Sequence, residues 1–169
     1  VENMTDITCH RGPDDRGIWI DQNNGVLLNH TRLSINDLSE EGIQPMTSQN
    51  GRYVIVFNGE IYNYVELRKE LEGMGHSFRT QTDTEVLLVA WRFWGQKALD
   101  KLDGMFAFTV FDKLENTLTC VRDPFGIKPF YYCKEGESFV LTLFKDTNNK
   151  GMGRYTITTF VTLQDSQSD

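Results

Sequence analysis

The stretch VIVFNGEIYN, residues 54–63, decides how the middle of this chain folds. Its apolar residues end at Phe57, and Asn58-Gly59 follows, which is the strongest short-range signal for a hairpin turn. A hairpin needs a return strand, but only residues 60–62 precede Asn63, where a helix is predicted to start. That is shorter than a typical strand. We therefore predict that the strand ends at Phe57 and that Asn58-Gly59 forms a corner leading into the helix.

Such a corner can also serve a catalytic function. An Asn carboxamide next to a Gly backbone N–H is a donor pair that can stabilise the oxyanion of an acyl-transfer reaction. On residue types alone, an ordinary turn is the favoured explanation of Asn58-Gly59. Both interpretations stay open at this point.

Composition indicates a globular protein of one domain, or two small ones. The chain has 169 residues, 39% of them hydrophobic, and a formal net charge of −7. An acidic chain argues against nucleic acid or an anionic membrane as partner, and no apolar run is long enough to span a bilayer. Three cysteines without a CxxC pair favour a reduced, cytoplasmic protein. The three histidines lack the spacing of a zinc site, so no metal is expected.

Hydrophobic periodicity predicts strands, then helices, then strands. Strands are expected at 17–21, 25–35 and 52–57, helices at 65–75, 86–95 and 96–104, and a short strand at 76–80 between the first two helices. From residue 105 onward, an antiparallel meander is expected at 105–112, 117–123, 130–133 and 138–144, with one more strand at 154–163. This order predicts an α+β fold with helices packed on an antiparallel sheet.

Two helix starts carry the pattern of a capping box. Asn63 and Glu66 precede the first helix, and Thr82 and Glu85 precede the second. In such a box the side chain of the first residue accepts a backbone N–H of the first turn. The side chain of the acid three residues later accepts the backbone N–H of the first residue in return.

Two charged residues have both a structural and a functional interpretation. Arg32 lies in an apolar strand, where it can face solvent or clamp a carboxylate. Asp83 lies at the start of a helix, where it can simply favour the helix dipole or receive a ligand's ammonium group. Taken singly, the structural interpretation is the simpler one for each.

Seven motifs that follow one another along the chain favour the functional interpretation over the structural one. They are HRGPDDRG (10–17), HTRLSINDLS (30–39), QPM (44–46), VFNGEIYNYVELRKEL (56–71), TDTEVLL (82–88), LDGMFAFTVFD (102–112) and RDPFGIKPFYY (122–132). With them the chain resembles the class II glutamine amidotransferase domain, most closely that of glutamine-hydrolysing asparagine synthetases. The resemblance implies an N-terminal-nucleophile hydrolase fold, an αββα sandwich of two antiparallel sheets.

The resemblance also implies a function and a site. The family hydrolyses glutamine and passes ammonia to a second domain, where ATP-activated aspartate accepts it. Carried over, Asn58 and the N–H of Gly59 are the oxyanion hole and Arg32 is the clamp on the glutamine α-carboxylate. Asp83 is the partner of the α-ammonium with Glu60 beside it, and Leu33 and Ile35 are pocket wall. Glutamine is the expected ligand, and a synthetase domain or subunit is the expected partner.

The chain also departs from the family pattern. The family nucleophile is an amino-terminal Cys whose own amine can act as base, whereas residue 1 here is Val. We expect the nucleophile strand to be absent and glutaminase activity to be negligible, because losing a nucleophile can cost about a millionfold in rate. Residues 1–144 are expected to form the amidotransferase-like domain and 145–169 a divergent segment. ATP and magnesium belong to the synthetase domain, so no cofactor is expected here.

Three other hypotheses remain open. The chain could be a non-catalytic glutamine-binding module, a module that binds a synthetase subunit, or a relative that serves sugar or peptide acceptors. Residual glutamine affinity without hydrolysis would favour the first, and copurification with a synthetase would favour the second.

Overall fold

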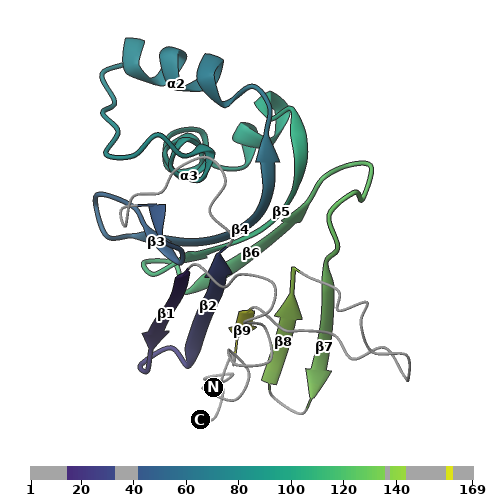
Figure 1. Cartoon of the computed structure of the whole chain (residues 1–169). Helices are drawn as coiled ribbons and strands as arrows, with labels where there is room; N and C mark the ends of the chain where they lie inside the picture. The colour runs from purple at the N-terminus through teal and green to yellow at the C-terminus, as the bar shows by residue number, and fades with distance from the viewer. Residues whose placement is uncertain (1–14, 33–41, 136–137, 144–158, 162–169) are drawn as a thin grey trace.

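The computed structural model describes residues 15–32, 42–135, 138–143 and 159–161 (Figure 1). Its strands are β1 Asp15–Asp21, β2 Val26–Arg32, β3 Met46–Thr47, β4 Tyr53–Ile61, β5 Gly104–Asp112, β6 Thr117–Arg122, β7 Tyr131–Glu135, β8 Ser138–Thr142 and β9 Thr159–Val161. Its helices are α2 Tyr64–Gly73, α3 Asp83–Trp94 and the 3-10 helix η3 Gly95–Lys101.

The strands form two antiparallel sheets that pack face to face. One has the order β3-β4-β5-β6 and the other β1-β2-β9-β8-β7. In Figure 1 the helices cover one face of the four-stranded sheet, and the five-stranded sheet lies on its opposite side. The predicted sandwich of two antiparallel sheets is therefore confirmed. Met4 and Ile7 lie three residues apart, which predicts the end of a helix at residues 1–9, and this segment lies outside the described residues.

Strand β4 is buried on both faces, which explains its unbroken apolar run. Ile55 and Phe57 point to the helices and share a core with Leu87 and Phe108. The alternate residues Val54 and Val56 instead join Val26, Leu28, Phe111 and Leu141, which fill the space between the two sheets. The four-stranded sheet is thus the middle layer, and β4 carries residues of both cores.

The predicted corner at Asn58-Gly59 is wrong. Strand β4 continues through both residues to Ile61, and Asn58 pairs with Ala107 and Gly59 with Phe106 of β5. The strand continues because β5 pairs with it along its whole length, from Tyr53 to Ile61. Gly59 adopts φ 154°, and a Cβ there would collide with the Met105 carbonyl oxygen. Glycine is needed for this close approach of two backbones, so the Asn-Gly pair is neither turn nor corner.

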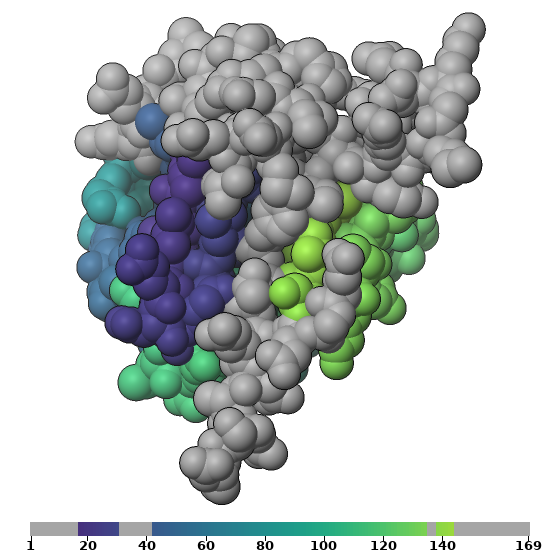
Figure 2. Space-filling model, turned by 90° about the horizontal axis from the view of Figure 1, so that it is seen from below, coloured from purple at the N-terminus to yellow at the C-terminus, as the bar shows by residue number. Residues whose placement is uncertain are grey.

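Other expectations also need correction. Residues 76–80 form no strand, and the predicted meander is divided, because β5 and β6 belong to one sheet and β7 and β8 to the other. The alternation of Cys120 and Cys133 along the meander predicts core thiols, but both are exposed. Within the segment 145–169, the structure describes β9, which pairs with both β2 and β8. Figure 2, viewed from below, shows the β1–β2 hairpin in purple and β7–β8 in green on one face of the molecule.

No helix among the described residues is long and apolar enough to cross a membrane.

Candidate functional site

The predicted donor pair lies near the end of β4, where the two cores meet. Asn58 follows the side-chain alternation of Val54 and Val56, and its side chain therefore points toward the five-stranded sheet. Its Nδ2 donates to the Leu143 carbonyl oxygen over 2.6 Å. A carboxamide nitrogen has two hydrogens, so this bond orients Asn58 and leaves a second N–H for another acceptor.

The backbone N–H groups of β4 alternate between two directions. Tyr62 donates to the Asp103 carbonyl at the β5 side, so even-numbered positions point toward β5. Odd-numbered positions point to the opposite edge, as two of them show directly. The Phe57 N–H donates to Gln44 Oε1 over 2.6 Å, and the Ile61 N–H donates to Asp83 Oδ2 over 3.1 Å.

Gly59 lies between these two donors along the same edge. Strand β3 does not reach that far, because it pairs with β4 only at Val54 and Ile55. No acceptor for the Gly59 N–H is found at this edge among residues 15–32, 42–135, 138–143 and 159–161. The Gly59 N–H therefore has no partner at this edge among the described residues, and its role as an oxyanion donor stays a prediction.

Helix α3 delivers Asp83 to this edge. Thr82 caps the helix, and its Oγ1 accepts from the Glu85 N–H over 3.2 Å, which is the first half of the predicted capping box. The reciprocal half is not formed, because the Thr82 N–H donates to Thr80 Oγ1 instead of to Glu85. Asp83 is the first helical residue. Its bond to the Ile61 N–H brings the start of α3 against the end of β4.

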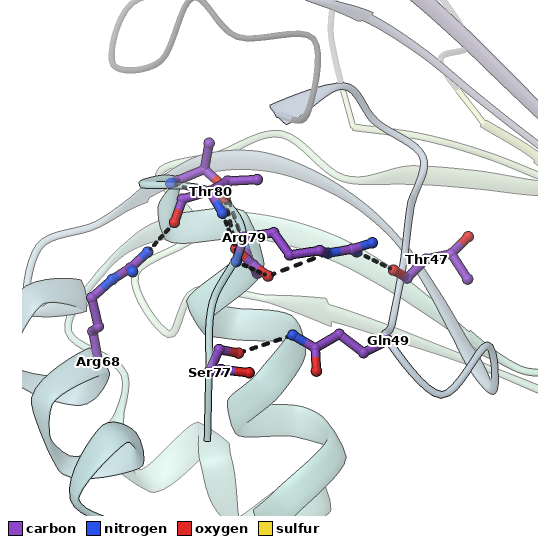
Figure 3. Close-up of polar contacts among 8 residues, drawn as sticks. Thr47, Gln49, Arg68, Ser77, Arg79 and Thr80 are labelled. Atoms are coloured by element: carbon purple, nitrogen blue, oxygen red, sulfur yellow. Dashed lines mark hydrogen bonds and ion pairs between the residues drawn. The ribbon is translucent and has the colours of Figure 1, made fainter. Parts of the chain in front are cut away.

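A buried carboxylate holds the chain that leads into α3. Glu85 is 2% exposed and accepts from the N–H groups of Arg79 and Thr80 at 3.0 and 2.6 Å. The Thr80 hydroxyl adds a third donor at 2.8 Å. Figure 3 shows Arg79 and Thr80 in this network, with Arg68 donating to the Thr80 carbonyl from the other side. These contacts replace the strand that the sequence predicts at 76–80.

Asp83 is a carboxylate in an unfavourable environment. Burial raises the pKa of Asp83, and the negative charge of Glu60 adds to this, against the opposing effect of backbone N–H groups that include Ile61. No Lys or Arg of the described parts of the chain forms an ion pair with either acid. Two acids without a cationic partner create a favourable place for a cation, and the α-ammonium of an amino acid has the required charge.

Three predicted residues cannot be brought into this geometry. Arg32 is the last residue of β2 and pairs with Asp15 of β1, but its side chain is not described. Leu33 and Ile35 lie outside the described residues. Their predicted roles stay predictions.

One structural support was missed by sequence reasoning. Asp123 precedes Pro124, a pair that by sequence alone indicates turn chemistry. In the structure Asp123 is buried and accepts four backbone N–H groups, those of Phe106, Phe125, Ile127 and Lys128. Burial works against the charged form, yet these donors lower the pKa of Asp123. Phe106 is the pairing partner of Gly59, so Asp123 supports the strand behind the site. The tight Pro-Gly-Pro spacing of residues 124–129 was the available signal.

No group of three or more His, Cys, Asp or Glu residues that could hold a metal ion occurs in the described part of the molecule.

Comparison with known proteins places these residues in context. The profile of a glutamine amidotransferase domain matches residues 1–152. Asparagine synthetase [glutamine-hydrolyzing] 3 of Bacillus subtilis is 46% identical over 142 residues, which cover 83% of this chain and 23% of the relative. Asparagine synthetase [glutamine-hydrolyzing] 1 of the same organism is 48% identical over 132 residues, 78% of this chain and 20% of the relative. The chain thus spans about a fifth of the length of these relatives.

A solved structure supports the same fold. Glutamine phosphoribosylpyrophosphate amidotransferase from B. subtilis superposes with a TM-score of 0.58 at 27% identity, over 67% of this chain and 26% of that one.

Proposed function

Because the chain belongs to the glutamine amidotransferase domain family, we propose that the site at the end of β4 binds free L-glutamine. We further propose that the whole protein uses glutamine as the source of ammonia for asparagine formation. The relatives named asparagine synthetase support this acceptor. The observation that carries the proposal is the contact between Ile61 and Asp83, because it places a half-buried carboxylate two residues from the Gly59 N–H.

The ends of glutamine find complementary groups here. Asp83, with Glu60 beside it, receives the α-ammonium, and Arg32 receives the α-carboxylate through a charge-assisted contact. The side-chain amide of the ligand then lies toward Asn58 and Gly59.

Asn58 and Gly59 supply the chemical function of the site. Hydrolysis of an amide places negative charge on the carbonyl oxygen, and donors fixed in advance stabilise that charge without reorganisation. The Gly59 N–H points to the open strand edge, and Asn58 is oriented by its bond to Leu143. The backbone of β4 holds Gly59 in place, and the carbonyl of Leu143, the residue after β8, holds the Asn58 side chain.

A binding experiment tests the proposal without depending on turnover. L-glutamine and 4-carbamoylbutanoate, which is glutamine without the α-ammonium, are titrated into the wild-type chain and into Asp83→Asn. The wild type is expected to prefer glutamine, and Asp83→Asn to lose about tenfold or more in glutamine affinity, since a hydrogen bond to a charged group contributes about 1.5–3 kcal/mol. The analogue should bind both proteins alike.

The exposed acid Asp100, in η3, provides a matched control. Asp100→Asn changes the same charge away from the site and should leave both affinities unchanged. If the wild type binds no glutamine, or binds both ligands equally, the proposal is wrong.

A further inference from the structure

Gln44 is a buried glutamine that the proposed chemistry does not use. It is 7% exposed, and each end of its carboxamide has a partner. Oε1 accepts the Phe57 N–H over 2.6 Å, and Nε2 donates to Thr84 Oγ1 over 3.2 Å. Phe57 is next to Asn58, and Thr84 is next to Asp83. A single side chain therefore joins the neighbours of two proposed site residues.

The backbone of Gln44 cannot do this task itself. Pairing of β3 with β4 ends at Met46 and Ile55. Further back, the Gln44 carbonyl lies so close to Gly17 of β1 that a Cβ at Gly17 would collide with it. The backbone at Gln44 therefore lies away from the edge of β4 and against β1. The Gln44 side chain, in place of a backbone carbonyl, accepts the Phe57 N–H at that edge.

The contacts form a closed ring around the strand edge. Gln44 holds the Phe57 N–H, and Asp83 holds the Ile61 N–H. Gly59 lies midway between these positions. The link from Gln44 to Thr84 then ties the start of α3 back to the first contact. Gln44 is held at both ends of its carboxamide and Asp83 is held by the Ile61 N–H, so the ring sets the distance between the Gly59 N–H and the Asp83 carboxylate.

We propose that Gln44 is a positioning residue that fixes the spacing between the Gly59 donor and the Asp83 carboxylate, and that it thereby selects an amino acid of glutamine's length. The inference rests on the proposed glutamine site. Asparagine carries the same groups as glutamine but is one methylene shorter, so a rigid spacing discriminates between them and a loose spacing does not.

The test measures the ratio of asparagine to glutamine dissociation constants by NMR titration of the full chain. This ratio does not depend on the folded fraction, which lowers both affinities equally. The wild type should prefer glutamine. Gln44→Met removes both contacts with little change in volume, and should lower the ratio about tenfold, because small displacements in a rigid site are costly.

Two further variants make the test specific. Thr84→Val removes only the link to α3 and should lower the ratio in the same direction, which decides the matter if Gln44→Met does not fold. Gln49→Met is the control, since Gln49 Nε2 donates to the Ser77 carbonyl on the exposed side of the molecule, as Figure 3 shows. That variant should keep the wild-type ratio.

The outcomes separate the two proposals. A wild-type chain that binds no glutamine overturns the glutamine site and this inference with it. A wild type that prefers glutamine, together with unchanged ratios in Gln44→Met and Thr84→Val, overturns the role of Gln44 alone.

Discussion

Helices α2 and α3 begin with the same local pattern but are held by different contacts. In α3, Thr82 caps the helix and Glu85 is buried. In α2, Asn63 occupies the cap position without any side-chain cap bond, and Glu66 is exposed. Asn63 instead donates to the Lys101 carbonyl over 2.8 Å and accepts from the Asp103 N–H over 3.0 Å.

The two helix starts differ because different backbone N–H and carbonyl groups near Asn63 and near Glu85 need a side-chain partner. The chain between η3 and β5 passes Asn63 and offers an unpaired carbonyl and N–H, so the Asn side chain serves that link. Before α3, the N–H groups of Arg79 and Thr80 have no strand to pair with, so Glu85 receives them. A capping pattern thus predicts where a helix starts, while the neighbouring chain decides what the side chains bind.

The largest expected effect is at Glu85. Glu85→Ala leaves the buried Thr80 N–H and the part-buried Arg79 N–H without an acceptor, and should lower the free energy of unfolding by about 2–4 kcal/mol. Glu66→Ala is the matched change in α2, and should stay within about 0.5 kcal/mol because the side chain is exposed. Urea denaturation of the two variants measures the contrast. Equal losses of stability would show that Glu66 and Glu85 contribute alike to the starts of α2 and α3.

The next prediction compares Thr82, which caps α3, with Asn63, which binds the chain between η3 and β5. Thr82→Ala should cost about 1–2 kcal/mol and Thr82→Ser much less, because Ser keeps the capping hydroxyl. Asn63→Asp should cost about 1 kcal/mol. Asp is as good a cap as Asn, but it cannot donate to the Lys101 carbonyl. Thermal unfolding of the three variants gives these values, and a stable Asn63→Asp would mean that Asn63 acts as an ordinary cap.

A smaller effect, of opposite sign, is expected at Asp83, the half-buried acid at the first position of α3. Its raised pKa means that the folded chain binds this proton more tightly than the unfolded chain. The stability it confers is therefore present below the unfolded pKa and is lost as pH rises through the folded pKa. Asp83→Asn removes this loss, so the variant should be more stable than the wild type at neutral pH while binding glutamine less well.

Asp112 provides the opposite control for this pH dependence. Its side-chain bond with Arg52 lowers the pKa of Asp112, so its contribution is present at neutral pH and is lost as pH falls through the folded pKa. Asp112→Asn should lose stability at neutral pH. Urea melts across the pH range compare the two slopes, and slopes of the same sign would contradict the assignment.

The smallest effect is at Lys101, which joins η3 to α2. Its Nζ lies 2.7 Å from Glu70 Oε1 and 4.6 Å from the Trp94 ring centroid. Both partners of the ion pair are partly exposed, so Lys101→Ala should cost about 0.5 kcal/mol, and less at high salt. Unfolding at two salt concentrations checks this. A loss as large as that of Glu85→Ala would mean that the link governs α2.

The sequence by itself determined which segments are helical and which residues are candidates for the site. The starts of α2 and α3 and the turn at Asn23–Gly25 follow from local capping and turn chemistry, which depend on neighbours in the chain. The identity of Asn58, Gly59, Glu60 and Asp83 as candidates came from motifs, and these also need no coordinates.

Only the tertiary structure decided how those residues meet. Asn58-Gly59 reads as a turn locally, but β5, distant along the chain, pairs with β4 from Tyr53 to Ile61, and this long-range pairing outweighs even a strong local turn signal. The same holds for residues 76–80, where a buried carboxylate takes the N–H groups that a strand would use. The ring from Gln44 through β4 to α3 joins three distant segments, and its members find one another only because unpaired backbone groups must be satisfied once they are buried.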